Sequence, residues 1–238
     1  MRLLTALAPL TLVALASPAF AAGSMQLTGH GEVMAAPDTA YVNSGVTTQA
    51  ETAKDALAAN TTDMTKLIET LKAAGIDSKD IQTSGFAVSP NYVYPQDNSG
   101  NPPKIVGYTV SNQVTVHVRD LTQLGTILDQ SVQVGANTIN GITFAVDDPS
   151  DLYAQARKAA FADAKAKAQL YAEAADVGLG DIQIISEQQN YNQPPQPVMY
   201  KATAMAADRS APVPVEVGQL TFSIDVNVNW ELGAATTN

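Results

Sequence analysis

The stretch LTFSIDVNVNWEL, residues 220–232, alternates apolar and polar side chains without a break. Successive side chains of a β-strand point to opposite faces, so this period of two predicts a strand with one buried and one solvated face. The stretch QVTVHVR, residues 113–119, has the same pattern. Two half-buried strands indicate an antiparallel sheet with one face left for helices to cover.

Three more segments predict strands, at residues 25–34, 41–48 and 139–146. Pro37 and Asp38, which favour turns, separate the first two segments. We therefore expect these two segments to pair as an N-terminal hairpin.

Gly29 and Gly31 flank His30 in the first of these segments. Their spacing is too short for a dinucleotide-binding fingerprint, and no helix pattern follows it. We expect the two glycines to permit a bulge or a close approach of another backbone in an edge strand.

Two helices are predicted between these strands. The first covers residues 52–74, with Thr52 as N-cap and Gly75 as a left-handed stop. The second begins at the capping residue Asp120 and ends near Gly135. Their expected apolar faces are Leu57, Met64, Leu67, Ile68 and Leu71 in the first helix, and Leu121, Leu124, Ile127, Leu128 and Val132 in the second.

The third predicted helix has Asp148 as a cap, Pro149 at its first position and an end at Gly178. Small side chains on one face predict close packing, and charges of both signs on the rest indicate a solvated surface rather than an anion-binding site. The packing face is Tyr153, Ala156, Ala160, Ala164, Ala168, Tyr171 and Ala175; the charges include Arg157, Lys158, Lys165, Lys167, Asp163, Glu173 and Asp176.

A unit of helix, strand, loop and strand occurs twice, at about residues 51–119 and 149–232. We therefore predict an α+β fold, a pseudo-duplicated domain over residues 22–238 with antiparallel sheets packed against about three helices.

The first residues have the pattern of a cleavable secretory signal. Met1 and Arg2 precede a short apolar run, and small alanines follow it, so we expect cleavage after Ala21 or Ala22 and export to the periplasm. No transmembrane segment is expected after cleavage. The chain has no cysteine and hence no disulfide, and its net charge of −10 argues against a nucleic-acid partner.

Residues 190–213 show no periodic pattern, and such long stretches inside compact domains are usually functional or disordered. Two interpretations stay open: a surface loop, or a contact arm or lid that uses Tyr191 and Tyr200. The shorter stretch at residues 94–104 repeats this composition.

No residues with the spacing of an active site occur in the sequence. His30 and His117 are the only histidines, and each lies at a polar position of an alternating strand, where an exposed or interstrand side chain is expected. The acids at Asp147, Asp148 and Asp151 do not fit a calcium loop and are better explained by helix capping. We therefore expect no catalytic, cofactor-binding or metal-binding residues.

Several short motifs occur together along the chain, and their combination resembles the SIMPL-domain family of bacterial envelope proteins. They are Thr28-Gly29-His30-Gly31-Glu32-Val33, Pro37-Asp38, Gly107-Tyr108, Gly135-Ala136-Asn137, Ile139-Asn140-Gly141-Ile142, Phe144, Ala156-Arg157-Lys158-Ala159, Asp163-Ala164-Lys165, Lys167-Ala168, Gly178 and Gly218. The resemblance implies a periplasmic or outer-membrane-associated protein of the periplasmic immunogenic or oxidative-stress-defence type. It implies a homo-oligomer and supplies no catalytic residues.

The leading hypothesis is a non-enzymatic, self-associating envelope protein that acts as a scaffold, adapter or stress-protective factor, with another envelope protein as a further candidate partner. The alternative is a periplasmic binding module for a small ligand or peptide. A hydrolase or antioxidant enzyme is the third hypothesis, and without cysteine it cannot use a thiol peroxidase mechanism.

Overall fold

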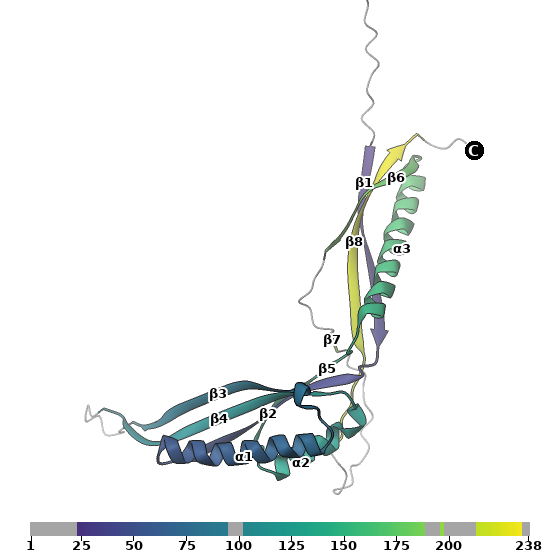
Figure 1. The fold of residues 1–238 in the computed structure, drawn as a ribbon. Helices are drawn as coiled ribbons and strands as arrows, with labels where there is room; N and C mark the ends of the chain where they lie inside the picture. The colour runs from purple at the N-terminus through teal and green to yellow at the C-terminus, as the bar shows by residue number, and fades with distance from the viewer. Residues whose placement is uncertain (1–22, 95–101, 189–195, 198–212, 235–238) are drawn as a thin grey trace, which may run out of the picture.

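Two lobes meet at a corner and give the molecule the shape of an L (Figure 1). The computed structural model describes residues 23–94, 102–188, 196–197 and 213–234. The upright arm, here called the terminal lobe, consists of β1 (Gly23–Ala35), α3 (Ser150–Ala174), β6 (Gly178–Gln188), β7 (Gln196–Pro197) and β8 (Leu220–Gly233). The other arm, the central lobe, consists of β2 (Thr39–Ala50), α1 (Ala53–Ala73), the 3-10 helix η1 (Ser78–Asp80), β3 (Ile81–Val93), β4 (Lys104–Val118), the 3-10 helix η2 (Leu121–Gln123), α2 (Leu124–Gln133) and β5 (Thr138–Ala145).

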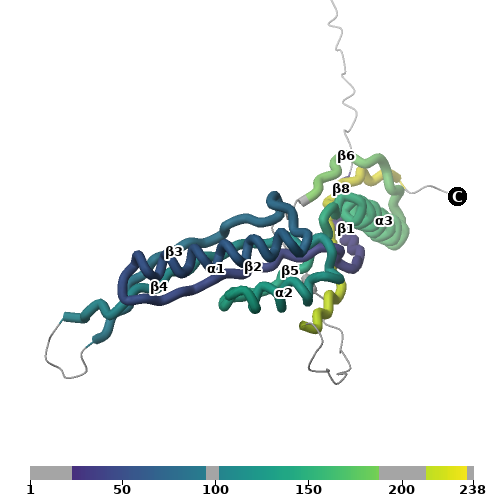
Figure 2. The backbone as a smooth tube through the Cα atoms, turned by 60° about the horizontal axis from the view of Figure 1, so that its bottom comes forward, coloured from purple at the N-terminus to yellow at the C-terminus, as the bar shows by residue number. Residues whose placement is uncertain are grey.

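The central lobe is an antiparallel sheet with the strand order β3-β4-β2-β5, and α1 and α2 lie together on one side of it (Figure 2). Asn60 of α1 is fully buried, and its side-chain amide donates hydrogen bonds to the carbonyl oxygens of Val46 (2.9 Å) and Val110 (3.2 Å). These bonds tie the helix to β2 and β4. The buried apolar core between them is Ala40, Val42, Val46, Met64, Leu67, Leu71, Val114, Val116, Val118, Leu124, Ile127, Leu128 and Ala136.

The ends of α1 agree with the prediction. The Thr52 hydroxyl accepts a hydrogen bond from the backbone N–H of Asp55, and Gly75 has a φ of 90°, which a residue with a side chain rarely adopts. The expected inclusion of Leu57 in the apolar face is wrong, because Leu57 is 41% exposed. Ala56, one position earlier, is buried instead.

The second predicted helix is two helices in the structure. Asp120 caps the 3-10 helix η2 by accepting a hydrogen bond from the N–H of Thr122, and α2 follows directly. Val132 is 56% exposed, so its expected place in the apolar face is wrong. It lies in the last turn of α2, where the preceding residue, Ser131, is the buried one.

The terminal lobe has the strand order β1-β8-β6, with β7 also paired to β8, and α3 packs on β1 and β8. Gly29 and Gly31 lie directly beneath α3: a Cβ at Gly29 would fall on the carbonyl oxygen of Ala160, and one at Gly31 on that of Ala156. The glycines therefore permit the expected close approach, and β1 pairs with β8 without a bulge. The buried core residues are Ala156, Ala160, Ala164, Ala168, Ile224, Val226, Val228 and Trp230.

Four details of the α3 prediction are wrong. Pro149 is the N-cap rather than the first helical residue, and Ala175 is exposed at the C-cap rather than part of the packing face. The helix ends at Ala174, and the left-handed residue after it is Asp176, with a φ of 53°, rather than Gly178, which begins β6. Tyr171 is 55% exposed, while the neighbouring Ala172 is buried against the sheet. A large ring does not fit where the helix and the strands are this close.

The predicted N-terminal hairpin is wrong. β1 pairs with β8, whereas β2 pairs with β4 and β5 in the other sheet. The turn-forming pair Pro37 and Asp38 carries the chain across the corner from one lobe to the other. A local turn signal cannot distinguish a crossing between lobes from a hairpin, because both need a change of direction.

Both lobes use the same arrangement of strands and helix. The order β3-β4-β2 with α1 in the central lobe corresponds to the order β6-β8-β1 with α3 in the terminal lobe. The predicted α+β class, with pseudo-duplicated antiparallel sheets packed against three α-helices, is confirmed.

Replacing Gly31 by alanine should lower the free energy of unfolding by about 1–3 kcal/mol, the usual cost of adding a methyl group to a closely packed interior. The new Cβ would collide with the backbone of α3 at Ala156 and Ala160. Gly23→Ala in the same strand is the control, because its Cβ would meet only side-chain atoms at 3.5 Å. Urea unfolding measures both variants, and equal stabilities would show that α3 does not depend on this approach.

Candidate functional site

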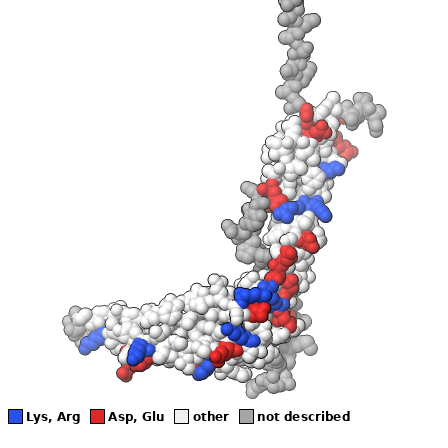
Figure 3. Space-filling view, in the orientation of Figure 1, with Lys and Arg blue, Asp and Glu red and all other residues white. Residues whose placement is uncertain are grey.

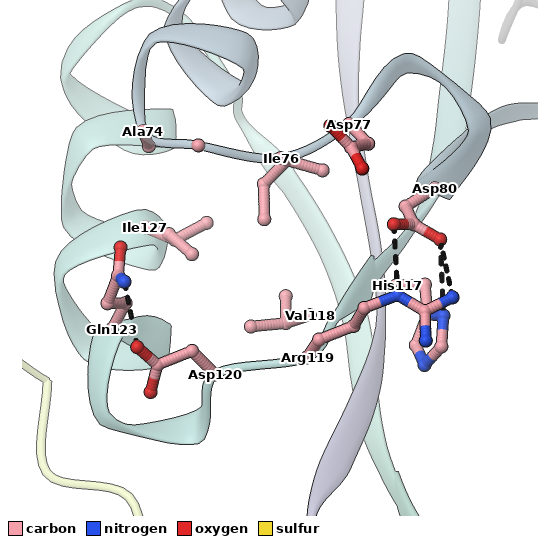
Figure 4. Close-up of a pocket in the computed structure, with 11 residues that line it drawn as sticks. Ala74, Ile76, Asp77, Asp80, His117, Val118, Arg119, Asp120, Gln123 and Ile127 are labelled. Atoms are coloured by element: carbon pink, nitrogen blue, oxygen red, sulfur yellow. Dashed lines mark hydrogen bonds and ion pairs between the residues drawn. The ribbon is translucent and has the colours of Figure 1, made fainter. Parts of the chain in front are cut away.

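Polar side chains from four segments converge where the central lobe meets the corner. Asp80 ends η1, His117 and Arg119 lie at the end of β4, and Thr39 begins β2. Asp147 lies between β5 and α3, on the path to the other lobe. These five residues are here called the corner cluster, and Figure 4 shows Asp80, His117 and Arg119 pointing toward one another.

His117 lies at the centre of the corner cluster and is only 9% exposed. Its Nε2 is 2.7 Å from the Thr39 hydroxyl, and its Nδ1 is 3.4 Å from a carboxylate oxygen of Asp80. The ring of Tyr41 stacks on the imidazole, with 4.4 Å between centroids and 8° between planes. Of the two positions expected for this histidine, exposed or interstrand, the structure shows the interstrand one.

Arg119 connects the two carboxylates of the corner cluster. Its Nε and Nη2 donate to the two oxygens of Asp80 at 3.1 and 3.0 Å, and its Nη1 donates to Asp147 at 2.7 Å. Hydrogen bonding from Arg119 lowers the pKa of Asp80, and the same bond raises the pKa of the guanidinium. Only 8% of the Asp80 side chain is exposed, so this bidentate pair compensates a carboxylate charge that has lost most of its contact with bulk water.

A cavity of about 140 Å³ lies beside the corner cluster, and Figure 4 shows it between the end of α1, η1 and α2. Small-molecule sites usually have volumes of about 300–1,000 Å³, so the cavity is suited to water or a small ion rather than to a metabolite. Its lining is Ala74, Gly75, Ile76, Asp77, Asp80, His117, Val118, Arg119, Asp120, Gln123 and Ile127.

The order hydroxyl, imidazole, carboxylate at Thr39, His117 and Asp80 is that of a nucleophilic triad. Thr39, however, is 1% exposed, so a substrate carbonyl has no path to its oxygen. Within the described residues, no group of three or more His, Cys, Asp or Glu side chains has positions that suit a metal ion. The contacts of the corner cluster join the start of β2, η1, the end of β4 and the linker between β5 and α3.

A second polar group lies on the terminal lobe around His30. Its Nδ1 is 2.8 Å from Asp225 of β8, and its backbone N–H donates to Asp163 of α3 at 2.8 Å. Asp163 also accepts a hydrogen bond from Lys167 at 2.7 Å. Hydrogen bonding to Asp225 raises the pKa of His30, with a smaller contribution from the charge of Glu32.

Other residues singled out in the sequence have structural partners. Asp148 accepts hydrogen bonds from the N–H and hydroxyl of Ser150, as expected for a capping side chain. Arg157 of α3 forms a bidentate pair with Glu187 of β6. The proposed contact arm with Tyr191 and Tyr200 lies outside the described residues.

Sequence reasoning missed Thr39, Asp80 and Asp147 as partners of His117. Each comes from a different segment, and no spacing in the chain links them. The one available signal was that His117 and Arg119 lie at the end of a strand that is otherwise rich in valine. Buried polar side chains need hydrogen-bond partners, so a polar residue at such a position indicates partners from other segments.

The sheet of the central lobe is almost free of charge. Strands β2, β3 and β4 contain one Lys, Arg, Asp or Glu among them, Lys104, and in the view of Figure 3 the charged atoms gather along α1 and near the corner. The far end of the β3–β4 hairpin is apolar yet exposed. Its exposed members, here called the hairpin-end surface, are Phe86, Val88, Tyr92, Val93, Tyr94, Ile105 and Val106.

The chain is similar to proteins of known sequence over nearly its whole length. A family model described as SIMPL, a protein of unknown function (DUF541), matches residues 25–230. The 26 kDa periplasmic immunogenic protein of Brucella melitensis is 42% identical, over 87% of this chain and 83% of that protein. The uncharacterized protein YggE of Escherichia coli K12 is 28% identical, over 86% of this chain and 81% of that protein. None of the described helices is long and apolar enough to span a membrane.

Replacing Asp225 by asparagine should lower the pKa of His30 toward its ordinary value, because the strongest partner of the imidazolium is removed. In the parent, protonated His30 interacts favourably with Asp225 in the folded state, and this contribution to the free energy of unfolding is complete below about pH 6.5, the ordinary pKa of histidine. The contribution is lost as the pH rises through the raised pKa of folded His30. NMR titration of the imidazole measures the shift. The control is Asp181→Asn on β6; an equal titration curve in D225N and D181N would contradict the assignment.

Proposed function

The chain belongs to the SIMPL family, and from this membership we propose that it is a non-enzymatic protein of the periplasm that associates with copies of itself. The matched relatives are named as immunogenic or uncharacterized proteins, and no catalytic family is indicated. Within this proposal the protein acts as a scaffold, adapter or stress-protective factor. Its association with the outer membrane and with other envelope proteins is part of the same proposal.

The hairpin-end surface is the observation that carries self-association. Tyr92 and Val93 are neighbours in β3 and point to opposite faces, and they are 49% and 53% exposed. Ile105, which pairs with Tyr92 across the hairpin, is 49% exposed. The hairpin therefore presents apolar side chains on both faces, which a neighbouring molecule could cover.

The charge pattern favours a second copy as the neighbour. The whole chain has a net charge of −10, which repels another copy over most of its surface. The hairpin-end surface contains no charged residue, and Lys104 beside it is the one charge on the described part of the hairpin. Two copies can approach through this end of the central lobe and bring only Lys104 of each described hairpin near the contact.

Free strand edges support the same proposal. β3 ends the sheet of the central lobe, and β6 ends that of the terminal lobe. Exposed edges pair with other chains unless they are protected. Pro90 in β3 and the register shifts in β3 and β6 limit backbone pairing of these edges with other chains. The side chains of the two edge strands remain available for contact with a second copy.

Ligand binding in the periplasm is a second candidate, favoured by a groove of about 350 Å³ between α1 and α2. Its lining is uncharged and contains several hydrogen-bonding side chains: Thr70, Ala73, Ala74, Thr122, Gln123, Thr126, Ile127 and Gln130. Native mass spectrometry of the protein purified from the periplasm distinguishes the two candidates. A bound mass on a monomer would favour the ligand, and multiples of the chain mass would favour self-association.

The triple variant Val88→Thr, Tyr92→Thr, Ile105→Thr should weaken self-association at least about tenfold, because burial of each large apolar side chain contributes on the order of 1.5–3 kcal/mol. Threonine keeps the strand preference, so circular dichroism should not change. Light scattering over a range of concentrations measures the mass. Val132→Thr on α2, which removes a side chain that is 56% exposed, is the control. A monomeric parent, or an unchanged mass of the triple variant, would rule out this surface.

Export should remove about the first 21 residues, which lie outside the described part of the chain. β1 begins at Gly23, so the expected cleavage leaves the first strand complete. Mass spectrometry of the protein recovered from the periplasm checks this, and a species that retains Met1 and Arg2 would show that the signal is not processed.

A further inference from the structure

The two lobes have separate cores. One buried cluster lies between α1, α2 and the sheet of the central lobe, and the other between α3 and the sheet of the terminal lobe. The extensive contacts between helices and strands all lie within one lobe or the other. The angle of the L in Figure 1 must therefore be set by the segments that connect the lobes.

Two linkers cross the corner, at residues 36–38 and 146–149, and a third connection, the segment that precedes β8, follows β7 and so starts and ends in the terminal lobe. The first two are bonded to each other. The N–H of Asp38 donates to the carbonyl oxygen of Ala145 at 3.1 Å, and the N–H of Asp147 donates to a carboxylate oxygen of Asp38 at 2.8 Å. In the third connection Val215 packs against the core of the central lobe.

Arg119 joins this pair of linkers to the central lobe. Its Nη1 donates to Asp147 at 2.7 Å, while its other nitrogens hold the buried carboxylate of Asp80. A carboxylate oxygen of Asp80 in turn lies 3.4 Å from Nδ1 of His117. A continuous series of polar contacts thus runs from the interior of the central lobe to both linkers.

Proline on each linker adds to this restraint. Pro37 precedes Asp38, and Pro149 follows the linker residue Asp148 and occupies the N-cap of α3. Proline restricts its own φ and the conformation of the residue before it, so each linker has few accessible directions. Because the 146–149 linker is bonded to Arg119 and to the 36–38 linker, the end of β1 and the start of α3 have fixed directions.

We propose that Arg119, Asp147 and Asp38 form a clamp that sets the angle between the two lobes. The clamp acts at the corner because, among the described residues, no helix or strand of one lobe forms an extensive packed surface with an element of the other. Hinges of this type are a few residues at the ends of elements, where small changes of backbone direction move a whole lobe.

The consequence for assembly rests on the proposed self-association. Each copy carries the hairpin-end surface at the end of one arm, so the angle of the corner decides where that surface lies relative to the terminal lobe. A contact between unlike surfaces closes into a ring only for certain rotations and otherwise forms open chains. A fixed corner would favour a single assembly size.

The test uses spin labels, one on each lobe. The chain has no cysteine, so Ala59→Cys on α1 and Ala166→Cys on α3, both exposed, accept labels at these two positions alone. Double electron–electron resonance gives the distribution of the distance between them. Labelled protein is diluted into an excess of the same unlabelled chain, so that pairs within one molecule are measured even in an assembly.

The decisive variants are Asp147→Ala and Asp38→Ala. The first removes the carboxylate that accepts the hydrogen bond from Arg119, and the second removes the carboxylate that accepts the hydrogen bond from the N–H of Asp147. Both leave Asp80 paired with Arg119, so the buried carboxylate keeps its partner. Asp63→Ala is the matched control, because it removes an ion pair of 3.0 Å with Lys66 on α1, away from the corner.

We expect the distance distribution to become at least about twofold broader in D147A and in D38A, with D63A like the parent, as a released hinge requires. Circular dichroism should show unchanged secondary structure in all three. Distributions as narrow as that of the parent in D147A, D38A and the double variant would overturn the clamp. Light scattering on the same samples separates the proposals: a monomeric parent with broadened variants would refute self-association and leave the clamp in place.

Discussion

The pairing of β1 with β8 is the contact on which the rest of the structure depends. It brings together strands from the two ends of the described chain, so that Thr28 and Asn227 face each other although 199 positions separate them. Once these strands are adjacent, the chain between them must leave the terminal lobe, build the central lobe and return. The corner and its linkers are a direct result.

This long-range pairing needs strong local compensation, because bringing distant segments together costs chain entropy. The compensation comes from α3, whose row of alanines lies directly over Gly29 and Gly31. Small residues on both sides allow the backbones to approach closely, so dispersion contacts form along the full length of the helix. The alanines also explain why α3 can be long and largely polar and still be well packed.

Charge is distributed unevenly over the molecule. The strands of the central lobe are nearly uncharged, whereas the polar clusters with His30 and His117 have their charges compensated by neighbouring groups. Buried or paired charges of this kind restrain the backbone where strands end. The apolar side chains of the hairpin end, in contrast, are largely exposed, and they are the surface to which we assign the proposed self-association.

The sequence by itself determined the elements and the class of the fold. Alternation over residues 220–232 predicted β8, Thr52 and Gly75 marked the ends of α1, and the alanines of α3 indicated a closely packed face. These signals are local, since each depends on the period or the backbone preference of neighbouring residues. The motifs shared with the SIMPL family also indicate the family from the sequence alone.

Only the tertiary structure decided which strands pair and which polar groups meet. Pro37 and Asp38 look the same in sequence whether they form a hairpin or cross a corner, so the partner of β1 could not be predicted from its own segment. The corner cluster is hidden for a similar reason. Thr39, Asp80 and Asp147 reach His117 and Arg119 because three connections converge at the end of β4, and that convergence depends on the paths of separate segments rather than on the spacing of any one.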